Sequence, residues 1–209
     1  MTAHGIAGIL VDLDETLHSR EAAFWSWIES EANAAGGAEH LDRERIATLD
    51  QRGRGDKQAL FEYLDTALGW NESHAQRLAR FRAGIASFVR PDPGVRELLE
   101  RLIGRYRLGL VSNGASRTQR RTLARLQITH LFEPVVISEE VGFRKPDARI
   151  FEFALAKWPI PRESVLFVGD DPTADIQGAR AVGMRALRVG ADDGIASFTM
   201  LESWLERHD

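Results

Sequence analysis

The sequence predicts an α/β fold, a doubly wound parallel sheet interrupted after its first strand by an all-helical insert. Apolar runs rich in branched residues, such as 6–11 and 165–168, end in polar or glycine residues, as buried strands of parallel sheets do. Strand and helix patterns alternate from about residue 91 onward, whereas residues 18–88 show helical patterns alone. The predicted domains are therefore a core, residues 1–17 and 89–209, and a helical cap, residues 18–88.

Glycine-containing breaks divide the insert into four predicted helices, at 24–35, 43–49, 57–68 and 72–88. The core is predicted to contain further strands at 107–111, 135–137, 165–168 and 186–189. Helices are expected between and after them at 93–106, 116–126, 148–157, 173–182 and about 197–207.

Composition narrows the functional class. The 209 residues are 44% hydrophobic, which is enough for a sizeable core, and no cysteine is present, which excludes disulfides and thiolate metal sites. A net charge of -4 without a long basic block argues against nucleic-acid binding. No signal-peptide pattern is present, and no apolar run approaches about 18 residues, so we expect a cytoplasmic protein without membrane contact.

Carboxylates follow two of the predicted strands. Asp12 and Asp14 come directly after the first strand, and Asp170, Asp171 and Asp175 follow a later one. The carboxyl ends of strands are where open α/β sheets bind their ligands. Like charges about 4 Å apart repel by roughly 4 kcal/mol at an effective dielectric constant of about 20, so the cluster calls for a cation. Oxygen ligands without thiols favour Mg²⁺.

The Asp12-x-Asp14 turn can divide the work of phosphoryl transfer. One ionised carboxylate can attack phosphorus and form an aspartyl phosphate without a base to activate it. The other can protonate the departing alcohol and later deprotonate water. Taken alone, the same spacing also fits an ordinary hydrogen-bonded turn.

Two further segments fit phosphate binding. The strand at 107–111 is followed by Ser112, Asn113 and Gly114, which offer hydrogen-bond donors beside the start of the next predicted helix. Lys145 precedes Pro146, which restricts the lysine backbone to extended conformations and directs its charge. A simple helix cap and a solvated lysine are the alternative interpretations.

Together these segments resemble the four motifs of the haloacid dehalogenase superfamily, in order and in strand context. The motifs are residues 12–17 (DLDETL), 112–114 (SNG), 145–146 (KP) and 169–176 (GDDPTADI). The resemblance spans essentially the whole chain and implies a Rossmann-like core with a cap of the C1 type. It implies an Mg²⁺-dependent phosphoric monoester hydrolase rather than a dehalogenase, because 2-haloacid dehalogenases lack the second aspartate of the first motif.

The resemblance also implies a role for each matching position. Asp12 would be the nucleophile and Asp14 the general acid and base. The metal would be bound by Asp12, by the backbone carbonyl of Asp14 and by Asp170, while Lys145 would steady the nucleophile. Ser112 and Asn113 would bind the transferring phosphoryl group. Supporting roles would fall to Thr16 in the turn, to Asp175 near the metal-bound waters or the lysine, and to Asp171.

Substrate choice is expected to come from the cap. The stretch 52–57 (RGRGDK) matches the glycine-containing cap loop of C1 relatives, and Arg54 and Lys57 could neutralise a distal acidic group of the substrate. A basic, solvated loop at a helix start is the alternative.

We therefore expect a phosphatase for a small phosphorylated metabolite, as a monomer or weak homodimer. A phosphomutase similar to β-phosphoglucomutase and a catalytically silent binding protein of the same fold are the alternatives.

Overall fold

The computed structural model describes residues 5–37 and 41–208 and contains a five-stranded parallel sheet in the order β3-β2-β1-β4-β5. The strands are β1 (Gly8–Val11), β2 (Arg107–Ser112), β3 (Val135–Ile137), β4 (Val165–Gly169) and β5 (Arg185–Arg188). All four neighbouring pairs are parallel, and β1, β2 and β4 are buried almost throughout. This arrangement confirms the predicted fold class.

The chain divides into two compact units. One unit contains the sheet, extends through Ser19 and resumes at Arg90, and the other is the helical insert Arg20–Val89. The insert contains α1 (Arg20–Ala34), α2 (Arg43–Asp50), α3 (Lys57–Leu68), α4 (His74–Gly84) and a short 3₁₀ helix, Ile85–Phe88. No helix of the described residues is long and apolar enough to cross a bilayer.

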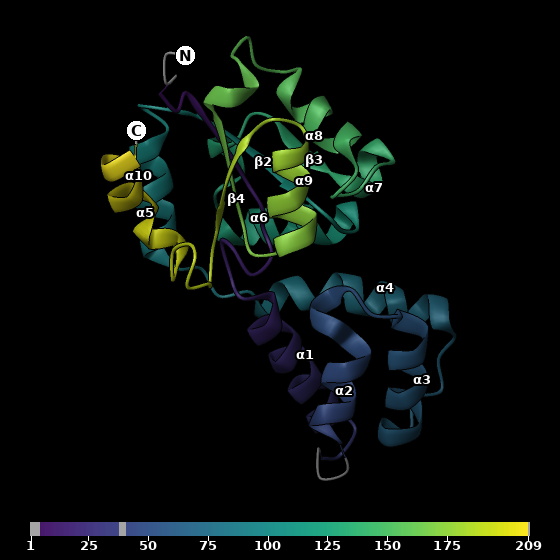
Figure 1. Ribbon diagram of the computed structural model, residues 1–209. Helices are drawn as coiled ribbons and strands as arrows, with labels where there is room; N and C mark the ends of the chain where they lie inside the picture. Colours follow the sequence, from purple (N-terminus) through teal and green to yellow (C-terminus); the bar gives the residue numbers. More distant parts are fainter. Residues whose placement is uncertain (1–4, 38–40, 209) are drawn as a thin grey trace. The chain divides into compact units, whose positions relative to one another are not determined.

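Helices cover both faces of the sheet, with α5 and α10 on one side and α8 and α9 on the other (Figure 1). The helices of this unit are α5 (Pro93–Leu102), α6 (Ser116–Leu126), α7 (Ser138–Val141), α8 (Ala148–Leu155), α9 (Gly178–Ala181) and α10 (Leu201–His208). From β1 the chain continues through β2 to β3 toward one edge of the sheet, and from β4 it continues to β5 at the other edge. The switch point, where such sheets place their ligand site, therefore lies between the ends of β1 and β4.

Trp158 packs directly against the backbone of β1 and β2. A Cβ added at Gly8 would lie 2.7 Å from Trp158 Cζ3, and one added at Gly109 would lie 3.0 Å from Trp158 Cζ2. The indole Nε1 donates to the backbone carbonyl of Glu133 at 2.8 Å. The two glycines thus make room for a large ring whose polar atom is satisfied.

The helical insert has its own aromatic core. Phe81 makes edge-to-face contacts with Trp27, Phe61 and Phe24 at centroid separations of 4.9, 5.8 and 6.4 Å. All four side chains are buried. Such pairs contribute roughly 0.5–1.5 kcal/mol each beyond their buried area, which gives this unit a specific core despite its small size.

The structure differs from the predicted elements mainly near the site. The segment predicted as one helix at 173–182 begins as a π-helix, Pro172–Gln177, and continues as α9. The short helix α7 was not predicted, because four residues are too few to show helical periodicity. Helix α5 ends at Leu102 rather than at residue 106, and the insert helix predicted at 72–88 begins at His74.

The packing of Trp158 predicts a cost for Gly109→Ala. The new Cβ would lie 2.7 Å from Leu10 Cδ2 as well as against Trp158, so we expect a loss of about 1–3 kcal/mol in the free energy of unfolding. Urea denaturation measures it. Gly104→Ala is the matched control, because no atom lies within 4 Å of its added Cβ. Equal stabilities of the two variants would contradict the prediction.

Candidate active site

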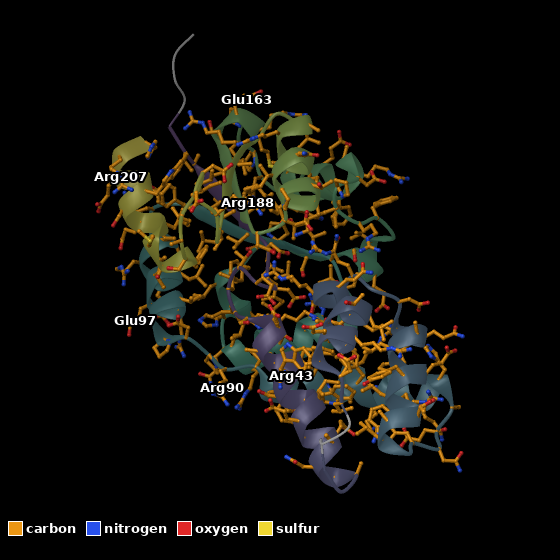
Figure 2. The ribbon with its side chains drawn as sticks, turned by 60° about the horizontal axis from the view of Figure 1, so that its bottom comes forward. Arg43, Arg90, Glu97, Glu163, Arg188 and Arg207 are labelled. Atoms are coloured by element: carbon orange, nitrogen blue, oxygen red, sulfur yellow. The ribbon has the colours of Figure 1, made fainter. Side chains whose placement is uncertain are left out.

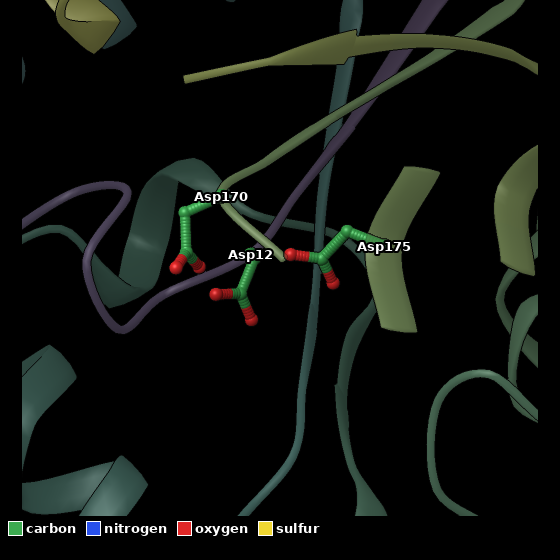
Figure 3. Close-up of side chains that lie close together, drawn as sticks. All are labelled: Asp12, Asp170 and Asp175. Carbon is green, nitrogen blue, oxygen red and sulfur yellow. The ribbon is translucent and has the colours of Figure 1, made fainter. Parts of the chain in front are cut away.

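Three carboxylates meet at the switch point of the sheet. Asp12 follows β1, Asp170 follows β4 and Asp175 lies in the π-helix. One oxygen from each lies within 4.8 Å of the others. Figure 3 shows the three side chains close together. The backbone N–H of Asp12 donates to the carbonyl of Val168 at 2.9 Å, which extends the β1–β4 pairing to Asp12.

Lys145 lies between two of these carboxylates. Its Nζ is 2.5 Å from Asp12 Oδ1 and 2.7 Å from Asp175 Oδ1, and only 2% of its side chain is exposed. Burial by itself disfavours the ammonium ion, but the charges of Asp12 and Asp175 outweigh burial and raise the pKa of Lys145. The lysine is therefore a fixed positive charge at the centre of the site.

One ammonium ion does not balance this acidic group. Burial raises the pKa of Asp12 well above its usual value, opposed by Lys145 and reinforced by Asp175 and Asp14. The carboxylates supply only hard oxygen ligands, as Mg²⁺ requires. The residues present therefore fit a divalent cation, which would supply the missing positive charge.

Asp14 is held at both carboxylate oxygens. Oδ1 lies 2.9 Å from Nε2 of His18, and Oδ2 accepts a hydrogen bond from Nε2 of Gln119 at 2.9 Å. The side chain of Asp14 is 28% exposed, whereas the His18 side chain is 2% exposed. The sequence pattern did not identify Gln119, which lies 105 residues from Asp14 in the chain.

The three residues expected at the phosphate differ in what they offer. Ser112 is buried and its Oγ lies 2.7 Å from Nε2 of Gln119. The amide side chain of Asn113 makes two hydrogen bonds of 2.9 Å with the backbone N–H and carbonyl of Lys145. The N–H of Gly114 donates to Ser138 Oγ at 3.0 Å. Asn113 thus positions Lys145, and Gly114 has already used the donor expected to face an anion.

Two side chains of helix α7 bind the first residue of α6. Glu139 accepts from the N–H of Ser116 at 2.8 Å, and Glu140 accepts from the Ser116 hydroxyl at 2.5 Å. Glu139 thus occupies the N–H of the first residue of α6, and the predicted contact of the α6 N-terminus with an anion stays a prediction.

The fourth motif is organised by its own backbone contacts. Asp171 Oδ1 accepts from the N–H groups of Thr173 and Ala174 at 2.8 and 2.9 Å, so Asp171 caps the π-helix. Nε of Arg188 donates to the backbone carbonyl of Asp170 at 3.1 Å, and Figure 2 shows Arg188 in the sheet-bearing unit. Thr16 Oγ1 is buried without a partner among the described residues.

The cap loop is organised around Asp50. Its carboxylate accepts from both terminal nitrogens of Arg20, at 2.6 and 2.9 Å, and from the N–H of Gly53 at 2.9 Å. Lys57 Nζ lies 3.0 Å from the same carboxylate. Burial would raise the pKa of Asp50, but the hydrogen bonds and charges of Arg20 and Lys57 outweigh burial and lower it.

The two residues predicted to contact substrate, Lys57 and Arg54, lie in different surroundings. The ammonium of Lys57 has three donors, and its neighbours Asp50, Gly53 and Gly55 provide three acceptor oxygens at 3.0, 3.4 and 3.4 Å. Lys57 thus stabilises the loop, and its predicted contact with substrate stays a prediction. Arg54 is exposed on the same loop.

A family model described as haloacid dehalogenase-like hydrolase matches residues 9–189. The chain belongs to this family, which confirms the resemblance inferred from the four motifs. A glyceraldehyde 3-phosphate phosphatase of Methanopyrus kandleri is 30% identical over 197 residues, which cover 88% of this chain and 84% of that protein. The class of enzyme expected from the sequence, a phosphoric monoester hydrolase, is the class to which this relative belongs.

Two further similarities are a partial sequence match and a match to a solved structure. A glyceraldehyde 3-phosphate phosphatase of Methanothermobacter thermautotrophicus is 42% identical over 107 residues, or 51% of this chain; the match spans about half of that relative's length, 47%. The solved structure of the HAD-hydrolase YfnB of Bacillus subtilis, bound to magnesium, has a TM-score of 0.81 at 22% identity, covering 97% of this chain and all of that one. This likeness shows the fold.

The Asp50 network predicts how acid affects the insert. Since the folded pKa of Asp50 is lowered, its contribution to stability is present above the unfolded pKa of about 4 and is lost as pH falls through the folded pKa. Asp50→Asn should reduce the free energy of unfolding by about 3 kcal/mol near neutral pH, because two cations lose their partner. The difference from wild type should shrink below about pH 4.

Urea denaturation at several pH values measures this difference. Asp42→Asn is the control, because Asp42 is an exposed cap of α2 and asparagine caps helices equally well. A difference that stays constant between neutral pH and pH 3 would contradict the assignment.

Proposed function

We propose that the protein is an Mg²⁺-dependent phosphatase that hydrolyses small phosphorylated metabolites through an aspartyl phosphate on Asp12. The observation that carries this proposal is the placement of Asp12 against Lys145, with a second carboxylate, Asp14, two residues further along the same turn. A buried, lysine-paired carboxylate next to a half-exposed and hydrogen-bonded one suits a nucleophile and a proton carrier.

The proposed reaction has two steps. In the first, a carboxylate oxygen of Asp12 bonds to phosphorus while the bond from phosphorus to the ester oxygen breaks, and Asp14 gives its proton to the departing alkoxide. In the second, water attacks phosphorus and transfers a proton to Asp14. The bond to Asp12 then breaks and inorganic phosphate leaves. Lys145 stabilises the negative charge of the phosphoryl oxygens in both steps.

The cation would be held by Asp12 and Asp170, together with the backbone carbonyl of Asp14. Asp175 is engaged by Lys145 and by the N–H of Asp171, which donates to Asp175 Oδ2 at 3.1 Å. Its proposed role is therefore to hold the lysine in place beside the metal ligands. When bound, Mg²⁺ supplies positive charge for the phosphoryl oxygens.

Small phosphorylated metabolites are the proposed substrate class. The relative from Methanopyrus kandleri is named for glyceraldehyde 3-phosphate, and the Escherichia coli relative YjjG, 37% identical over 122 residues, is named a pyrimidine 5'-nucleotidase. Arg54 is the proposed cap contact for a distal anionic group. A cytoplasmic monomer or weak dimer stays a prediction.

Phosphate release from a panel of metabolite phosphates tests the activity. Wild type with Mg²⁺ should hydrolyse at least one member, beginning with glyceraldehyde 3-phosphate, and chelator should stop the reaction. Asp12→Asn should lose at least about 10³-fold in kcat, because its amide is a poor nucleophile. Unchanged turnover in this variant would assign the activity to a contaminant. Label exchange between sugar phosphates without phosphate release would favour a mutase.

Metal binding can be measured without turnover. A cation that binds only the folded chain raises the free energy of unfolding by about 2.7 kcal/mol at one hundred times its dissociation constant. Thermal unfolding of wild type should therefore shift upward with Mg²⁺, and Asp170→Asn should shift much less. Asp171→Asn is the matched control, because its side chain caps the π-helix and should leave the shift intact. Equal shifts in all three proteins would contradict the proposed ligand set.

A further inference from the structure

Gln119 of helix α6 connects two residues of the proposed mechanism. Its side-chain nitrogen lies 2.9 Å from Asp14 Oδ2, 2.7 Å from Ser112 Oγ and 3.3 Å from the backbone carbonyl of Asn113. The residue is 2% exposed. Burying a polar side chain this deeply costs free energy unless its hydrogen bonds are made, and here they are made to residues of the candidate site.

The orientation of the Gln119 amide follows from its neighbours. A carboxylate and a carbonyl only accept hydrogen bonds, so the atom that faces Asp14 and Asn113 must be the amide nitrogen. This nitrogen carries two protons. One is directed to Asp14 and the other to Ser112, at the two shortest distances.

This arrangement determines what Ser112 can do. When Gln119 donates to Ser112 Oγ, the serine hydroxyl accepts through a lone pair, and its own proton is left to donate elsewhere. A phosphoryl oxygen is the acceptor that the proposed function supplies. Gln119 would thereby keep Ser112 as a donor toward substrate.

The backbone nearby makes room for this amide. A Cβ added at Gly114 would lie 2.9 Å from Cδ and 3.0 Å from Nε2 of Gln119. The absence of a side chain at Gly114 therefore allows the close approach of Gln119. The N–H of Gly114 is bonded to Ser138 Oγ.

His18 holds the other oxygen of Asp14. Its Nδ1 is buried and has no hydrogen-bond partner among the described residues. A proton on Nδ1 would be a buried donor without an acceptor, so the tautomer with its proton on Nε2, directed at Asp14 Oδ1, is favoured. Asp14 is thus fixed from two sides, by α6 and by its own turn.

We propose that Gln119 is a positioning residue that holds Asp14 in the orientation for proton transfer to the leaving group and keeps Ser112 as a donor. This inference rests on the proposed phosphatase function and assigns it a residue outside the four motifs. A proton carrier contributes only while its oxygen is aligned with the leaving group, so loss of the restraint should appear as loss of general acid catalysis.

Leaving-group dependence separates this role from a structural one. The variant is Gln119→Met, which has similar length and no donor, and the quantity is kcat/KM, which covers steps up to release of the alcohol. An alkyl phosphate needs a proton on its departing oxygen, whereas p-nitrophenyl phosphate does not. We expect kcat/KM to fall about 10²-fold for the alkyl phosphate and less than about 10-fold for p-nitrophenyl phosphate.

Two further variants control for folding and charge. Leu123→Ala removes a buried apolar side chain from the same helix and should lower thermal stability without changing the ratio of the two substrates. Gln119→Glu keeps the shape but sets a carboxylate against Asp14, and should lose at least as much on the alkyl phosphate as Gln119→Met. The Mg²⁺-induced thermal shift of Gln119→Met should equal that of wild type, as expected of a folded metal site.

Each outcome has one meaning. Equal losses on both substrates, or a substrate ratio like that of Leu123→Ala, would overturn the role of Gln119 and leave the phosphatase proposal standing. Wild-type protein that is folded and binds Mg²⁺ but hydrolyses neither substrate would overturn the proposed function, and this inference with it.

Discussion

The candidate site depends on one buried ammonium group, that of Lys145, held between Asp12 and Asp175. Two carboxylates this close would repel each other strongly in a buried environment, and the attraction of each to the lysine between them offsets that repulsion. Lys145 also joins three segments that are far apart in sequence: the end of β1, the loop between α7 and α8, and the π-helix after β4. Asn113 fixes the backbone of Lys145 through two hydrogen bonds, so the end of β2 is tied to the same group.

The parallel sheet explains why these groups meet. Parallel strands align their carboxyl ends on one edge, so an aspartate after β1 and another after β4 become neighbours once the strands pair. This consequence can be predicted from apolar runs and the residues that end them. The strands, the insert and the acidic cluster could therefore be located in the sequence before any coordinates, and the family assignment followed from the order of the motifs.

Contacts that depend on side-chain direction could not be predicted in the same way. Gln119 lies within a helix whose pattern shows only that its face is partly buried, and nothing local indicates that Asp14, 105 positions earlier, is its partner. Asp171 is one of two adjacent aspartates, and only the backbone path after β4 decides that it caps a helix while Asp170 remains at the site. Lys57 appeared suited to substrate because its charge is visible in the sequence, whereas Asp50, which engages it, is seven residues away.

The site therefore has two levels of construction. Charged residues of the four motifs lie at the strand ends, and further residues, both inside and outside the motifs, restrict the orientation of those charged side chains. Asn113 restrains Lys145, Gln119 restrains Asp14 and Ser112, and Asp171 begins the turn that carries Asp175. A carboxylate at rest in water samples many orientations, and general acid catalysis uses only a few of them. The rate at such a site should consequently be sensitive to the amides of Asn113 and Gln119, because they set the fraction of time in which the charged groups are aligned.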